Sequence, residues 1–94
     1  MIMRRVKLTM SGKVNGVFFR AFIKDKASEL NLKGYTQNTP DKKVEVIVEG
    51  HDIMIKRLIE FCRTGPKDCK VENIQIDEQQ YKAEFNTFRV KWKL

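Results

Sequence analysis

The order of apolar and polar residues along the chain predicts a strand followed by a helix near the N-terminus. Between residues 5 and 14, apolar residues and glycine alternate strictly with polar ones, which is the period of a strand with one buried face. From about residue 19 to residue 30, apolar residues recur at helical spacing and charged residues fill the opposite side. The predicted inward positions are Val6, Leu8, Met10, Gly12 and Val14 in the strand, and Phe19, Phe22, Ile23, Ala27 and Leu30 in the helix.

The following segments predict a hairpin, a second helix and two further strands. "LKGYTQN" and "KVEVIVEG" flank a turn that contains Pro40 and Asp41, so they predict a hairpin. Residues 51–64 carry an apolar stripe at helical spacing and are followed by Gly-Pro, which ends a helix. Strands are expected at about residues 71–78 and again at residues 88–94, where apolar and basic residues alternate.

This order of elements indicates the fold class. β-α-β-β-α-β with one additional C-terminal strand fits an α+β fold, the ferredoxin-like or split βαβ sandwich, in which two helices cover one face of an antiparallel sheet. A chain of 94 residues is long enough for one two-layer core and too short for two. Residues 1–94 are therefore expected to form a single domain.

Composition narrows the classes of ligand and location. Lys and Arg number 19 against 12 Asp and Glu, a net charge of +7 that attracts anionic partners by long-range steering. No apolar run approaches the roughly 20 residues that span a bilayer, and no apolar stretch of a secretory signal follows the N-terminal arginines. A cytoplasmic protein without membrane association is expected. Cys62 and Cys69 lack metal-ligand spacing and are expected to be reduced, with a bridge between them as the open alternative.

The segment "GKVNGVFFRAF", residues 12–22, is the first candidate site, and it contains no Cys, Ser, Asp or His. It joins the first strand to the first helix, where backbone N–H groups lack intrahelical partners and the helix dipole favours an anion. Gly16 lets the chain approach a phosphate closely, and the guanidinium of Arg20 can hold two phosphate oxygens at once. Spacing alone supports equally well an ordinary turn followed by a solvated arginine.

Two motifs in this order resemble those of the acylphosphatase family. "GKVNGVFFR" is similar to the family's Gly-x-Val-Gln-Gly-Val-x-Phe-Arg, and "GYTQNTPDKKVEV" is similar to its Gly-Trp-Val-x-Asn followed by a turn and Val-Glu-Val. "GPKDCKV" and "FNTFRV" resemble later segments of the family, so the resemblance covers nearly the whole chain. It implies a hydrolase that cleaves the carboxyl–phosphate bond of acyl phosphates, with neither a metal ion nor another cofactor.

The resemblance also implies which residues form the site. The family's phosphate-binding arginine falls on Arg20, and its water-orienting asparagine falls on Asn38. The expected phosphate cradle consists of Arg20 with the backbone of Asn15, Gly16, Val17, Phe18 and Phe19. The departures from the family pattern are Asn15 for Gln, Tyr35 for Trp and Lys42 for the Gly of an Asp-Gly turn. None of them removes a group that the chemistry needs.

The residue types in the loop favour the same chemistry independently. A site with no nucleophile catalyses phosphoryl transfer to water by positioning and charge stabilisation. The leaving group must then be a weak base such as a carboxylate, so an acyl phosphate fits, whereas an alkyl phosphate monoester would need a general acid. A loop that holds only the phosphate tolerates many acyl groups, and broad specificity is expected.

Two other functions fit parts of the sequence. The fold class also serves RNA recognition, but the open face of the central strands is predicted to lack the aromatic residues on which bases stack. The residues predicted there are Arg5, Lys7, Thr9, Glu45, Ile47 and Glu49. A non-catalytic phosphate-binding module is the second alternative, and the presence of both Arg20 and Asn38 disfavours it. The lone histidine, His51, is assigned no role. We therefore expect a monomer with a small-molecule substrate, and not a nucleic-acid partner.

Overall fold

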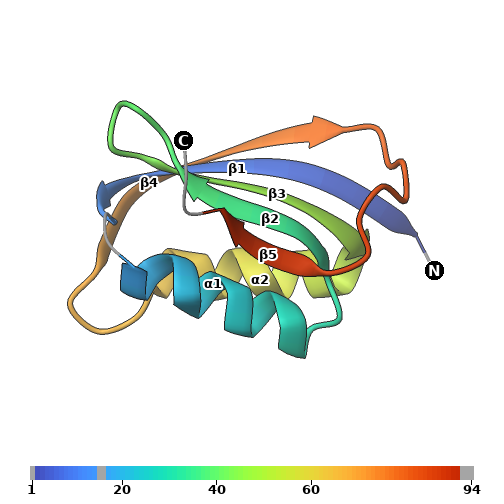
Figure 1. Ribbon diagram of the computed structural model, residues 1–94, viewed down its shortest axis with the longest axis horizontal. Coiled ribbons are helices and arrows are strands. Elements are labelled where there is room, and N and C mark those ends of the chain that lie inside the picture. Colours follow the sequence, from blue (N-terminus) through green and yellow to red (C-terminus); the bar gives the residue numbers. More distant parts are fainter. Residues whose placement is uncertain (1, 15–16, 92–94) are drawn as a thin grey trace.

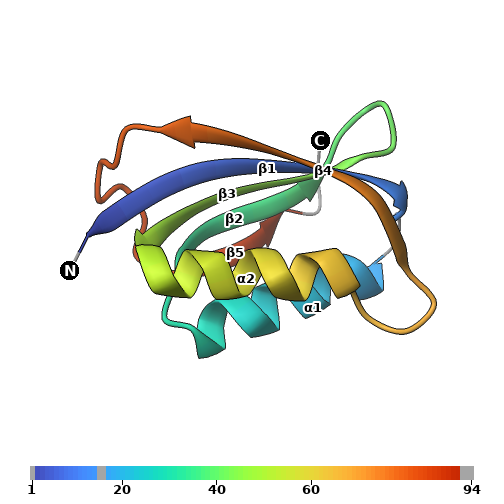
Figure 2. The ribbon, with the colours of Figure 1, turned by 180° about the vertical axis from the view of Figure 1, so that it is seen from behind.

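The computed structural model describes residues 2–14 and 17–91, and these build one sheet and two helices. The elements follow in the order β1 (Met3–Lys13), α1 (Val17–Glu29), β2 (Lys33–Asn38), β3 (Val44–His51), α2 (Asp52–Thr64), β4 (Lys70–Gln79) and β5 (Phe88–Lys91). The strands lie in the spatial order β4-β1-β3-β2-β5, and both helices cover the same face of the sheet (Figures 1 and 2). The ferredoxin-like α+β class predicted from the sequence is confirmed.

The core lies between the sheet and the helices, and the sequence periods account for it. The alternating residues Val6, Leu8 and Met10 of β1 are fully buried, as predicted. On α1, Phe19, Ile23 and Ala27 are buried, whereas the predicted Phe22 and Leu30 are only partly buried against the core. α2 contributes Ile55, Leu58, Ile59 and Cys62. Within the described residues, neither helix is long and apolar enough to cross a membrane.

One strand pairing differs from the prediction of an antiparallel sheet. β1 pairs antiparallel with both β3 and β4, and β2 pairs antiparallel with β3, but β5 runs parallel to β2. β4 and β5 lie at opposite edges, so the segment between them crosses the sheet before β5 begins. This segment joins the sheet where the Gly34 N–H donates to the carbonyl of Thr87 at 2.9 Å, near the start of β2. Because β5 begins at that end, the two strands run in the same direction.

Gly34 permits the close packing of β2 on β3. A Cβ atom at this position would lie 1.9 Å from the carbonyl oxygen of Ile47, and the residue has a φ of +144°. Both conditions exclude an ordinary L-residue. The glycine that opens the "GYTQN" motif is therefore a structural requirement of the hairpin that carries Asn38.

Both cysteines are free thiols in the structure. Cys62 is fully buried in the core on α2, and this burial raises the pKa of its thiol to about 12. Cys69 is partly buried and packs against the core. The expectation that both are reduced agrees with this arrangement, and a protonated, buried Cys62 behaves as a small apolar residue.

The open face of the sheet, opposite the helices, carries an aromatic pair that the sequence did not lead us to expect. β1 and β3 contribute no aromatic residue there, as predicted, but Tyr35 of β2 lies beside Ile47 and meets Phe85 edge to face at 5.9 Å. Lys91 Nζ lies 3.8 Å from the centre of the Tyr35 ring, and the Arg5 guanidinium carbon lies 5.2 Å from that of Phe85. The chain's own cations thus occupy ring faces on which nucleic-acid bases would stack.

Glu49 of β3 holds the β4–β5 connection against the sheet. Only 2% of the Glu49 surface is exposed. The Glu49 carboxylate accepts hydrogen bonds from the backbone N–H of Lys82 at 2.8 Å and from that of Glu84 at 2.9 Å. Arg5 Nη1 lies 3.5 Å from the same carboxylate. Burial by itself raises the pKa of Glu49, but these hydrogen bonds and the Arg5 charge together place the pKa below its ordinary value.

The depressed pKa of Glu49 predicts a dependence of stability on pH. Because the folded state favours the carboxylate, its contribution is present above the ordinary glutamate value of 4.5 and is lost as the pH falls through the folded pKa. Glu49→Gln is expected to lower the free energy of unfolding at neutral pH by about 1–3 kcal/mol, and to weaken the fall in stability at acidic pH. Urea unfolding at several pH values tests this, with Glu45→Gln on the same strand as the control. Equal pH dependence in wild type and Glu49→Gln would contradict it.

Candidate functional site

Strand direction brings the predicted site residues to one end of the sheet. β2 and β1 are both antiparallel to β3, and β5 is parallel to β2, so β1, β2 and β5 all run the same way. Their C-terminal residues Lys13, Asn38 and Lys91 therefore lie at the same end of the sheet. α1 begins at this end of the molecule as well, in the helix layer, as both views show (Figures 1 and 2).

Arg20 is a buried residue in the first turns of α1. Only 6% of the Arg20 surface is exposed, and the Nη1 atom of Arg20 donates a hydrogen bond to the carbonyl oxygen of Lys91 at 3.4 Å. The hydrogen bond fixes the orientation of the guanidinium, and burial removes part of its water shell. Both effects strengthen its interaction with an anion. The alternative of a solvated helix arginine is thereby wrong. The contact also ties the start of α1 to the end of β5, more than 70 residues further along the chain.

The N-terminus of α1 provides the other positive feature of this end. The helix starts at Val17, and its first turn contains no acidic residue that would offset the helix dipole. The predicted cradle residues Val17, Phe18 and Phe19 form this first turn, with Phe19 buried and Phe18 78% exposed. Asn15 and Gly16, the other two predicted cradle residues, lie outside the described residues.

Asn38 is the last residue of β2, at the end of the sheet where α1 begins. It has the same parity as Gly34 and Thr36, which are buried on the helix side of the sheet, so it belongs to the face on which α1 packs. Its Oδ1 atom is buried and makes no hydrogen bond to the described part of the chain. A buried polar atom of this kind is costly unless a ligand or water satisfies it.

The turn after Asn38 is held by hydrogen bonds of the residues that follow it. The Thr39 N–H donates to the carbonyl of Lys43 at 2.9 Å, and the Thr39 hydroxyl accepts from the Lys43 N–H at 3.1 Å. Thr39 Oγ1 also donates to the carboxylate of Asp41. Lys42, which departs from the family's glycine, has a φ of +65°. Such a conformation costs an L-residue about 1 kcal/mol. The turn therefore forms with a lysine at this position, in place of the family's glycine.

His51 lies away from the candidate site. Asn38 pairs with Val44 at the start of β3, whereas His51 ends that strand, so His51 lies at the far end of the sheet. Across the described ranges, no group of three or more His, Cys, Asp or Glu side chains is arranged to hold a metal ion. The partner that sequence reasoning missed is Lys91, because its contribution is a backbone carbonyl that carries no sequence signal.

Comparisons with known proteins agree over nearly the whole chain. The family model described as Acylphosphatase matches residues 6–90. An acylphosphatase of Marinobacter nauticus is 40% identical over 89 residues, which cover 95% of this chain and 97% of that protein. One from Syntrophus aciditrophicus is 38% identical over 89 residues, covering 95% and 93%. A solved acylphosphatase structure from Coxiella burnetii superposes with a TM-score of 0.88 at 35% identity, covering 95% of this chain and 93% of that one.

Proposed function

The chain belongs to the acylphosphatase family and is an enzyme, and we propose that it hydrolyses the carboxyl–phosphate bond of acyl phosphates without a metal ion. The products are a carboxylate and inorganic phosphate. One observation supports the proposed site: two unusual residues lie at the same end of the sheet. Arg20 is buried at the start of α1, and the Oδ1 atom of Asn38 is buried without a hydrogen bond to the described residues.

The phosphate group is bound by Arg20 and by the backbone N–H groups of Asn15, Gly16, Val17, Phe18 and Phe19. The burial of Arg20 and its hydrogen bond to the Lys91 carbonyl support this role. Because the guanidinium is already held in place, substrate binding does not have to offset the entropy of ordering it. The dipole of α1 adds partial positive charge on the same side. Charge that develops on the phosphoryl oxygens in the transition state is stabilised by these fixed groups.

Asn38 positions the attacking water. Its Oδ1 can accept a hydrogen bond from that water, which directs an oxygen lone pair toward phosphorus, but an amide does not remove the proton. The substrate phosphate accepts the proton instead. The bond that forms joins the water oxygen to phosphorus, and the bond that breaks joins phosphorus to the acyl oxygen. The electron pair of that bond leaves with the carboxylate, a weak base that needs no general acid.

Hydrolysis assays test this function directly. The purified protein is assayed with benzoyl phosphate by absorbance, in the presence of a metal chelator, beside an alkyl phosphate monoester. We expect turnover of benzoyl phosphate and none of the monoester, because only the first has a leaving group that departs without protonation. If the protein binds inorganic phosphate but leaves benzoyl phosphate intact, the site is a binding site without the reaction and the proposed function is wrong.

A further inference from the structure

A cleft between α1 and β5 lies directly beside the proposed phosphate site. It has a volume of about 350 Å³ and is lined by Ala21, Lys24, Asp25, Phe88, Arg89 and Val90. Ala21 follows Arg20 in the chain, and Val90 precedes Lys91, so the lining residues flank the hydrogen bond between Arg20 and the Lys91 carbonyl on both elements. The cleft therefore adjoins the Arg20–Lys91 contact, and its volume suits a small organic group.

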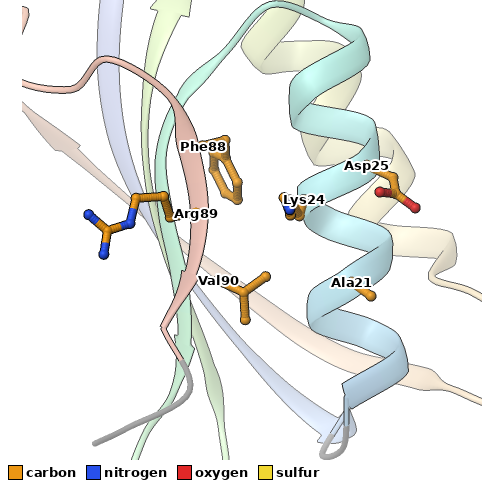
Figure 3. Close-up of a pocket in the computed structure, with 6 residues that line it drawn as sticks. All are labelled: Ala21, Lys24, Asp25, Phe88, Arg89 and Val90. Carbon is orange, nitrogen blue, oxygen red and sulfur yellow. The ribbon is translucent and has the colours of Figure 1, made fainter.

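Phe88 and Val90 give this cleft an apolar wall, and Lys24, Asp25 and Arg89 are its charged lining residues. Phe88 and Val90 project from β5 toward α1, and Lys24 lies on the side of α1 that faces β5 (Figure 3). Asp25 points away from β5, and Arg89 points away from α1 toward the opposite face of the sheet (Figure 3). Of the three charged lining residues, Lys24 is therefore the one whose side chain lies on the side of α1 that faces β5.

Lys24 also differs from the neighbouring lysine of the same helix. Lys26 lies 3.6 Å from a Glu29 carboxylate oxygen and 4.7 Å from the centre of the Phe61 ring, so it is used in packing between the helices. Lys24 is exposed and makes no ion pair within the described part of the chain. It stands four residues after Arg20, a rise of about 6 Å along the same side of the helix.

We propose that this cleft binds the acyl group of the substrate and that Lys24 selects acyl phosphates whose acyl group carries a second negative charge. The inference rests on the proposed function, because it takes the phosphate to be bound at Arg20. With the phosphate there, the body of the acyl group contacts Ala21 and Val90, and a carboxylate at its far end reaches the Lys24 ammonium group. The broad specificity expected from the loop is thereby narrowed by a residue outside the loop.

The test compares two substrates that differ only by the distal charge, benzoyl phosphate and para-carboxybenzoyl phosphate. The measured quantity is the ratio of kcat/KM for the charged substrate to kcat/KM for the neutral one. Lys24→Gln is expected to lower this ratio up to about fivefold through KM, the effect of losing one exposed ion pair. Lys24→Glu is expected to lower it further. Added salt should bring the wild-type ratio toward that of Lys24→Gln, because an exposed pair is screened.

Lys26→Gln is the matched control, since it removes one positive charge from the same helix on the side that faces α2. An unchanged ratio in Lys26→Gln together with a lower ratio in Lys24→Gln supports the assignment. Equal ratios in wild type and both Lys24 variants overturn it while leaving the acylphosphatase function intact. An equal loss in Lys26→Gln also overturns it, because the effect is then one of net charge. If the wild type fails to hydrolyse benzoyl phosphate, the proposed function falls and this inference falls with it.

Discussion

Arg20→Ala is expected to reduce kcat/KM for benzoyl phosphate by roughly 10³-fold or more, the range found when a charge-stabilising group is removed from a phosphoryl-transfer site. Arg20 is the side chain that the proposed mechanism places on the phosphate, and the helix dipole alone does not replace a bidentate guanidinium. Arg20→Lys is expected to lose most of the activity as well, since an ammonium group keeps the charge but not the planar pair of donors.

Because Arg20 is buried, the fold of each variant has to be verified separately. Circular dichroism and the unfolding midpoint establish whether the variant is folded, and Arg57→Ala, which removes an exposed arginine of α2, serves as the control for net charge. A folded Arg20→Ala protein with near wild-type kcat/KM would mean that the phosphate is bound elsewhere. Loss of activity in Arg57→Ala to the same extent would mean that overall charge, and not the position of Arg20, governs the rate.

Asn38→Ala is expected to lower kcat by about 10²-fold with little change in KM. Orientation of the water matters mainly in the transition state, so its loss appears in kcat and in kcat/KM together. Steady-state kinetics with benzoyl phosphate measure both constants. Asn73→Ala on β4 is the matched control, because it removes an exposed asparagine outside the proposed site. A rise in KM at constant kcat would show instead that Asn38 binds the substrate.

The same variant has a second readout in its stability. The Asn38 Oδ1 atom is buried without a hydrogen bond to the described residues, and Thr39 holds the turn that follows. Replacing Asn38 by alanine therefore removes a buried polar atom that makes no hydrogen bond to the described residues. We expect the unfolding free energy of Asn38→Ala to equal or exceed that of wild type. Activity that falls while stability holds is the behaviour of a residue kept for function.

Sequence patterns predicted most of the fold because each pattern is a local property. The alternation along β1 requires that Val6, Leu8 and Met10 face the same side, and the helical spacing on α1 does the same for Phe19, Ile23 and Ala27. The direction of β5 was the exception. It depends on the route of the segment between β4 and β5, which is held by the buried Glu49, and a glutamate in an alternating strand reads as solvent-exposed.

Spacing and motif order are properties of the linear chain, so they were sufficient to predict the ferredoxin-like class, the extent of the main elements, and Arg20 and Asn38 as candidates. Three features required the folded chain: the burial of Arg20 against the Lys91 carbonyl, the turn after Asn38 that Thr39 holds, and the position of Lys24 across a cleft from β5. The Tyr35–Phe85 pair on the open face also became visible only there. Apart from the turn, each of these features joins residues far apart in sequence, and their contact depends on strand order and direction, which no local pattern encodes.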